Sequence, residues 1–149
     1  MPAGAQHRKN IIKEIVSTEV TYTESLRLLE ENFRAPLRQG NIITPEQDHL
    51  IFLNGHSILE LHVPLLEKLQ AAWREAEEED QVDNLCVGKI LLDIVPWLRL
   101  YITYINGAQE GAQLLDTLNR RVSPVFFPKA RSDDHQERQF PLCSHWMLR

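Results

Sequence analysis

The sequence lacks the motifs on which most enzymes of known chemistry depend. Its two cysteines, Cys86 and Cys143, are far apart and form neither a CxxC site nor a disulfide framework, so reduced thiols are expected. Its six glycines are scattered, which excludes a phosphate-binding loop or a dinucleotide turn. An HExxH helix and a nucleophile elbow are absent too. Covalent catalysis is therefore the least favoured function class, and we expect neither a cofactor nor a metal.

A basic face and a membrane-spanning run are also lacking. The formal net charge is −5, which argues against binding to nucleic acid. The most apolar stretch, Ile90 to Ile105, is interrupted by Asp93, Pro96 and Arg99 and is too short to cross a bilayer. The first ten residues are polar and contain no apolar signal region. We therefore expect a cytoplasmic protein.

The acidic excess is confined to one segment. Residues 41–82 contain nine acidic and two basic side chains, whereas the other segments are nearly balanced. The excess comes chiefly from the run between Glu75 and Asp80. A run of this kind is typical of a solvated loop, and it has no ordered ligand spacing that would indicate a metal site.

Apolar side chains at helical spacing predict a long first helix from about Lys9 to about Phe33. Proline is absent from this stretch until Pro36, and Gly40 ends the segment. A broad apolar face on so long a helix is typical of a bundle. The shared face contains Ile11, Ile15, Thr18, Tyr22, Leu26, Leu29 and Phe33.

The second helix has a clear start and a predicted interruption. Thr44 is a good N-cap, Pro45 suits the first helical position, and Gln47 completes a capping box. Asn54-Gly55 predicts a stop or kink with a left-handed backbone, after which Ser57 restarts the helix. Pro64 lies inside this later stretch and predicts a bend.

A third helix is predicted from about Asp83 to Ile105, with a kink at Pro96 and an end at Asn106-Gly107. A fourth, shorter helix covers Ala108 to Asn119. No segment alternates convincingly as a strand, so the predicted fold is an all-α, elongated helical bundle. The apolar positions of the third helix are Leu85, Ile90, Leu91, Ile94, Val95, Leu98, Tyr101, Ile102 and Ile105.

Glu19 is the unusual residue of the first helix. On a helical wheel it falls between Leu26 and Ile12, inside the broad apolar arc. Either it is a carboxylate at the edge of the stripe with no role, or it is held where apolar surface meets a partner. The histidines at positions 49, 56 and 62 have no i, i+4 spacing and are interpreted as surface or partly buried side chains.

A resemblance to a known family favours the second interpretation of Glu19. The segment Ile11 to Leu26 is similar to the first helix of Dbl-homology (RhoGEF) domains, with its "E-I-x-x-T-E-x-x-Y-x-x-x-L" core. Residues 33–37 and 51–69 continue the match, and residues 87–106 resemble the family's later "G…L-Y-x-x-Y-x-x-N" helix. These four stretches occur in the family's order between residue 8 and about residue 118.

The resemblance implies a helical bundle that binds Rho-family small GTPases and promotes GDP release without covalent chemistry. In the family, the glutamate of "T-E-x-x-Y" contacts switch I, and the matching residue here is Glu19. Thr18 and Ile15 are expected to share this GTPase-binding surface. Tyr22 and Leu26 are expected to support the core behind it.

The resemblance also implies what is missing. The family's switch II-contacting pattern, "K-P-x-Q-R-x-x-x-Y-P-L-L", has at most a faint echo in Gln139-Phe140-Pro141-Leu142. We therefore expect a partial Dbl-homology domain over residues 8–119 and an irregular tail over residues 120–149, as in a truncated isoform. Exchange should then be weak or absent, and apolar surface should be exposed and favour self-association. The alternative is a non-catalytic helical module that binds a GTPase or a partner helix.

Overall fold

The computed structural model describes residues 3–79 and 81–121, and every regular element within them is helical. This confirms the expected all-α class. The elements, in chain order, are α1 (Ala3–Leu28), η1 (Leu29–Arg34), α2 (Ala35–Gln39), α3 (Pro45–Phe52), α4 (Gly55–Glu78), η2 (Val82–Asn84), α5 (Val87–Leu92), η3 (Val95–Trp97) and α6 (Leu100–Arg121). The irregular tail expected over residues 120–149 lies outside the described residues from residue 122 onward.

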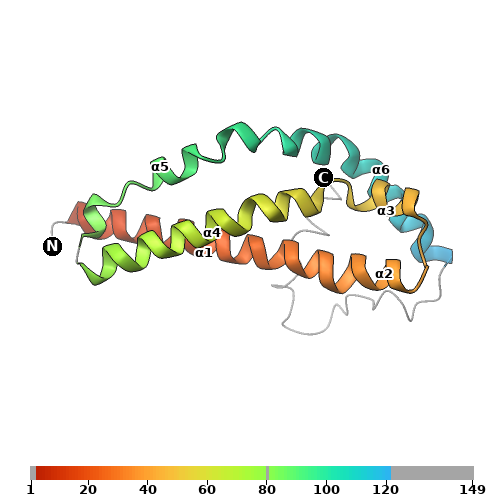
Figure 1. The fold of residues 1–149 in the computed structure, drawn as a ribbon, viewed down its shortest axis with the longest axis horizontal. Helices are drawn as coiled ribbons and strands as arrows, with labels where there is room; N and C mark the ends of the chain where they lie inside the picture. Colours follow the sequence, from red (N-terminus) through yellow and green to blue (C-terminus); the bar gives the residue numbers. More distant parts are fainter. Residues whose placement is uncertain (1–2, 80, 122–149) are drawn as a thin grey trace.

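The bundle is built on the two longest helices, α1 and α4, which lie side by side and antiparallel (Figure 1). The chain then returns above them through α5 and η3, and α6 reaches the end where α2 and α3 lie (Figure 1). The molecule is therefore elongated, and its apolar residues collect in two clusters, one toward each end.

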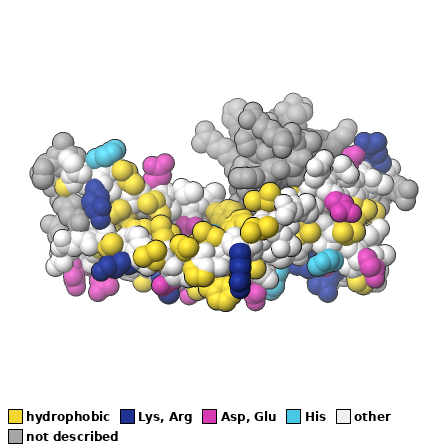
Figure 2. Space-filling model, turned by 90° about the horizontal axis from the view of Figure 1, so that it is seen from above, with side chains coloured by type: hydrophobic (Ala, Val, Ile, Leu, Met, Phe, Trp, Pro, Cys, Tyr) yellow, Lys and Arg dark blue, Asp and Glu magenta, His cyan; other side chains and the backbone are white. Residues whose placement is uncertain are grey.

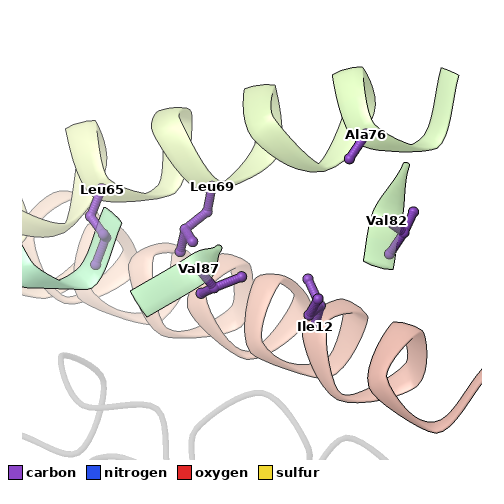
Figure 3. Packing of buried hydrophobic residues seen from close by; sticks show 6 residues of the cluster. All are labelled: Ile12, Leu65, Leu69, Ala76, Val82 and Val87. Atoms are coloured by element: carbon purple, nitrogen blue, oxygen red, sulfur yellow. The ribbon is translucent and has the colours of Figure 1, made fainter. Parts of the chain in front are cut away.

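The first cluster joins α1, α4, η2 and α5 (Figure 3). Leu69 is only 2% exposed, and burying a leucine of this kind contributes roughly 1.5–3 kcal/mol. The second cluster joins α2, α3 and the end of α6 around Phe52 and Leu118. The buried members of the first cluster are Ile12, Leu65, Leu69, Ala76, Val82 and Val87.

The first helix is longer than its sequence pattern predicts. It begins at Ala3, passes through the π-helical turn η1 and continues as α2 to Gln39. Pro36 does not end it: the backbone stays helical on both sides of this proline, just after the π-helical turn η1. Gly40 follows the last helical residue, as expected.

An ionic cluster fastens η1 to α3. The Arg34 guanidinium donates two hydrogen bonds to the Asp48 carboxylate, at 3.0 and 2.9 Å, and a third to Glu30 at 3.1 Å. Their side chains are 16%, 10% and 16% exposed, respectively. The hydrogen bond to Asp48 is the main reason that the pKa of Arg34 is raised. The cluster therefore joins the two segments through a fixed, two-pronged contact.

The capping box at the start of α3 is confirmed. The Thr44 hydroxyl accepts from the Gln47 backbone N–H at 3.3 Å, and the Gln47 side chain accepts from the Thr44 N–H at 2.9 Å. The interruption that follows differs from the expectation. The positive φ occurs at Leu53, at 48°, rather than at Asn54 or Gly55, and α4 already begins at Gly55. The Leu53 side chain lies against Gly107 of α6, so tertiary packing overrides the local preference.

The predicted third helix is wrong in its continuity. Residues 82–105 are divided among η2, α5, η3 and the start of α6, with Pro96 inside the short turn η3. The predicted end at Asn106-Gly107 is also wrong, because α6 runs unbroken from Leu100 to Arg121 and includes the predicted fourth helix. Gly107 and Gly111 allow α6 to approach Leu53, Leu50 and Ile51 closely, which accounts for glycine inside this helix.

Several apolar residues that the pattern placed inward are exposed. Ile102 and Ile105 are 61% and 63% exposed, and Leu92, which is not among the predicted inward positions, is 67% exposed. Figure 2 views this side of the molecule and shows hydrophobic side chains gathered along its middle. We call this surface the apolar strip; its members are Leu92, Val95, Trp97, Leu98, Ile102 and Ile105. None of the helices described is both long and apolar enough to cross a membrane.

Candidate GTPase-binding site

The three residues expected to bind the GTPase lie within two turns of α1, with the spacing i, i+3 and i+4 that places side chains on one helix face. Thr18 is exposed and Glu19 is partly exposed. Ile15 is also partly exposed, but it packs against the first apolar cluster. The face therefore offers a hydroxyl and a carboxylate beside an apolar residue that is already anchored.

Glu19 has a partner within the chain. Its Oε1 lies 2.5 Å from Nδ1 of His62 on α4, and the two side chains are 15% and 8% exposed. A carboxylate inside an apolar arc is costly unless it is hydrogen-bonded, and His62 supplies that bond. The carboxylate is thus neither free on the surface nor fully sequestered.

The contact continues as a chain of hydrogen bonds across three helices. Nε2 of His62 lies 2.8 Å from the hydroxyl of Tyr101 on α6, and this hydroxyl lies 2.7 Å from the hydroxyl of Tyr22 on α1. The ring of His62 meets Tyr22 edge-on, with centroids 4.8 Å apart, and Tyr101 at 6.0 Å. We call Glu19, His62, Tyr101 and Tyr22 the hydrogen-bonded chain.

Both tyrosines titrate outside their ordinary range. Burial is the first cause that raises the pKa of Tyr22, and the hydrogen bond to Tyr101 raises it further. Burial also raises the pKa of Tyr101, although its hydrogen bond with Tyr22 acts in the opposite direction. These opposite effects are expected when Tyr22 donates and Tyr101 accepts, because a hydrogen bond donated to Tyr101 stabilises its ionised form.

The two residues expected to support the core have different surroundings. Leu26 is 5% exposed and thus buried. Tyr22 is partly buried and places its hydroxyl in the hydrogen-bonded chain. Along α1, both lie between Ile12 of the first cluster and Phe33, which packs against the second. Within residues 3–79 and 81–121, no group of three His, Cys, Asp or Glu side chains is arranged to hold a metal ion.

Comparison with known proteins decides the family. The profile of the RhoGEF domain matches residues 11–147, which is most of the chain. This chain belongs to the RhoGEF domain family. It is 34% identical over 136 residues to the human FYVE, RhoGEF and PH domain-containing protein 3, covering 91% of the chain and 18% of that protein.

Other relatives of this RhoGEF domain are large proteins as well. The domain is 28% identical over 139 residues to Intersectin-1 of Xenopus laevis, covering 92% of the chain and 8% of the relative. It is 26% identical over 109 residues to the Myosin-M heavy chain of Dictyostelium discoideum, covering 73% and 6%. The chain thus spans less than a fifth of the length of these relatives.

The family match extends beyond residue 119, into the residues that the sequence pattern assigned to a separate tail. The boundary of the RhoGEF domain at that residue stays a prediction. Sequence reasoning did not identify His62 and Tyr101 as part of the site. One signal was present: His62 shares an α4 face with Ile58, Leu65 and Leu69, just as Glu19 lies in the apolar arc of α1. A polar side chain on the inward face of each of two helices indicates that the two side chains pair with each other.

Proposed function

We propose that this chain is an exchange factor that binds a Rho-family small GTPase through α1 and promotes release of GDP. The observation that carries the proposal is the placement of Glu19. Its motif resembles the family's "T-E-x-x-Y", the RhoGEF profile match over residues 11–147 includes it, and its carboxylate is partly accessible beside the exposed Thr18; these observations support the assignment of Glu19 as the switch I contact. Thr18 and Ile15 complete the proposed contact surface.

The proposed mechanism is linkage between two binding equilibria and involves no bond making or breaking in the protein. An exchange protein binds the nucleotide-free GTPase more tightly than the nucleotide-loaded form. By linkage, it lowers the affinity of the GTPase for its nucleotide by the same ratio. Only this difference in affinity drives release, since equal affinity for both forms would shift nothing. The chain's contribution is a rigid helix face that fits the altered switch I region.

We further propose that exchange by residues 1–149 alone is weak. The switch II-contacting pattern of the family has no full counterpart in this sequence. Contacts to one switch region provide less differential affinity than contacts to two. Binding without accelerated release would instead support a non-catalytic module that docks on a GTPase.

The test is release of fluorescent GDP from a panel of Rho-family GTPases, measured beside direct binding of the chain to each nucleotide-free GTPase. Glu19→Ala should lower binding roughly tenfold or more, since a hydrogen bond to a charged group contributes about 1.5–3 kcal/mol. Glu19→Gln keeps an acceptor for His62 but removes the charge, so it should weaken binding with a smaller loss of stability.

The matched control is Glu24→Ala, which removes an exposed glutamate elsewhere on α1. It should leave binding unchanged. Circular dichroism and thermal melting would establish that each variant is folded at the assay temperature. Equal binding by the wild type, Glu19→Ala and Glu24→Ala would contradict the proposed contact.

A further inference from the structure

Residues on two other helices hold Glu19, the proposed contact residue, through the hydrogen-bonded chain. Glu19 is on α1, His62 is on α4 and Tyr101 is on α6, with separations of 2.5 Å and 2.8 Å between the bonded atoms. The residues are far apart in sequence, so only the folded bundle brings them together. A change at α4 or α6 can therefore move the Glu19 carboxylate without touching it.

The hydrogen atoms in the hydrogen-bonded chain can be assigned from the chemistry of its four side chains. An ionised carboxylate only accepts, so Nδ1 of His62 must donate to Glu19. In a neutral imidazole the other nitrogen, Nε2, is then an acceptor, and it accepts a hydrogen bond from the Tyr101 hydroxyl. The Tyr101 oxygen in turn accepts a hydrogen bond from the Tyr22 hydroxyl. Each hydrogen has an acceptor in this arrangement, so we assign the Nδ1–H tautomer to His62.

The bond orients the carboxylate and leaves it able to bind. A glutamate has three rotatable side-chain bonds, and ordering it on association costs free energy that a preformed geometry has already met. The hydrogen bond to His62 uses Oε1 of Glu19. A carboxylate has about four acceptor positions, so others remain for a donor from the GTPase. With 15% of the side chain exposed, an incoming donor can still reach it.

We propose that His62 is a positioning residue for GTPase binding: its Nδ1–H, backed by Tyr101, holds the Glu19 carboxylate in the orientation that receives a donor from the GTPase. The inference rests on the proposed role of Glu19 as the switch I contact. His62 is 6% exposed and bonded to Glu19, so the proposed role is to act through the carboxylate and not by direct contact with the partner.

The first experiment examines the free chain and needs no GTPase. Nitrogen-15 NMR of the histidine side chains should show His62 as the Nδ1–H tautomer at neutral pH, and Glu19→Ala should shift the Nδ1 signal. The exposed His49 provides an internal control whose signals should not move. The Nε2–H tautomer in the wild type, or a His62 signal that ignores Glu19→Ala, would overturn the inference.

The second experiment is a double-mutant cycle on binding of the full chain to the nucleotide-free GTPase. His62→Leu should lower affinity about three- to tenfold, and it should have little further effect in the Glu19→Ala background. His62→Asn, which keeps a side-chain N–H near the position of Nδ1, should recover part of the loss. The folding control is Ile58→Val, one turn earlier on α4, which should leave affinity unchanged.

The outcomes separate this inference from the proposed function. If Glu19→Ala leaves binding unchanged, Glu19 is not the contact, and the role of His62 falls with it even when NMR detects the bridge. If Glu19→Ala weakens binding but His62→Leu lowers affinity by the same ratio in the Glu19→Ala background as in the wild type, His62 acts independently and the positioning role is overturned. Tighter binding by His62→Leu would overturn it too, because the bridge would then mask the carboxylate.

Discussion

A Cβ atom on Gly111 of α6 would lie 2.6 Å from the backbone carbonyl oxygen of Leu50 on α3. It would also lie 3.2 Å from the Cα atom of Ile51. The two helices therefore approach so closely that only a residue without a side chain fits. Because the obstructing atoms are backbone, no change of rotamer can relieve the contact.

Gly111→Ala should destabilise the chain by about 1–3 kcal/mol, the usual cost of overpacking a close contact. The matched control is Gly88→Ala in α5, where no atom lies within 4 Å of an added Cβ. This control should leave stability unchanged or raise it by up to about 1 kcal/mol, because alanine favours helix more than glycine. Thermal unfolding followed by circular dichroism measures both, and equal melting temperatures would contradict the close approach.

The Arg34–Asp48 contact should contribute more to stability than an exposed pair of the same type. Asp48→Ala leaves a mostly buried guanidinium without its main partner, and we expect a loss of about 3 kcal/mol. Asp116→Ala removes the partner of Arg120 at a site where the side chains are 57% and 77% exposed, so it should cost less than about 0.5 kcal/mol. Urea unfolding of the two variants tests the difference; similar losses would mean that burial of the Arg34 cluster contributes nothing.

The raised pKa of Tyr22 predicts instability at alkaline pH. A group with a folded pKa above its unfolded value contributes full stability below the unfolded pKa, which is about 10 for tyrosine. That contribution is then lost as the pH rises above about 10 toward the folded pKa. Tyr22→Phe keeps the ring and removes the ionising group, so its free energy of unfolding should fall less steeply above pH of about 10. Urea titrations at several pH values would measure the two slopes; identical slopes would exclude Tyr22 as the source.

Local chemistry made part of this fold predictable. The capping box depends on two residues close in sequence, Thr44 and Gln47, and the structure forms it as expected. The family pattern around Glu19 likewise identified the candidate contact. The positive φ at Leu53 and the unbroken α6 at Gly107 could not be predicted in this way. Both depend on how α3 and α6 approach each other, which no window of sequence contains.

The site was only partly predictable for the same reason. The helical wheel placed Glu19 in the apolar arc, but its partner His62 is on another helix. His62 and Tyr101 become neighbours only when α4 and α6 pack beside α1. Periodicity gives the inward face of each helix and not which residues meet across it.

The apolar strip should promote self-association of the chain. Leu92, Ile102 and Ile105 are each more than 60% exposed, and apolar surface of this kind seeks a partner in water. Light scattering at increasing concentration should therefore give a mass above that of the monomer. Replacing both Ile102 and Ile105 with lysine should shift the chain toward monomer without lowering its melting temperature, because exposed side chains contribute little to the core and lysine suits a helix. The control is Gln109→Lys together with Gln113→Lys, which adds the same charge to exposed positions of α6 but removes no apolar surface. A monomeric wild type, or equal dissociation by both pairs, would show that the strip does not drive association.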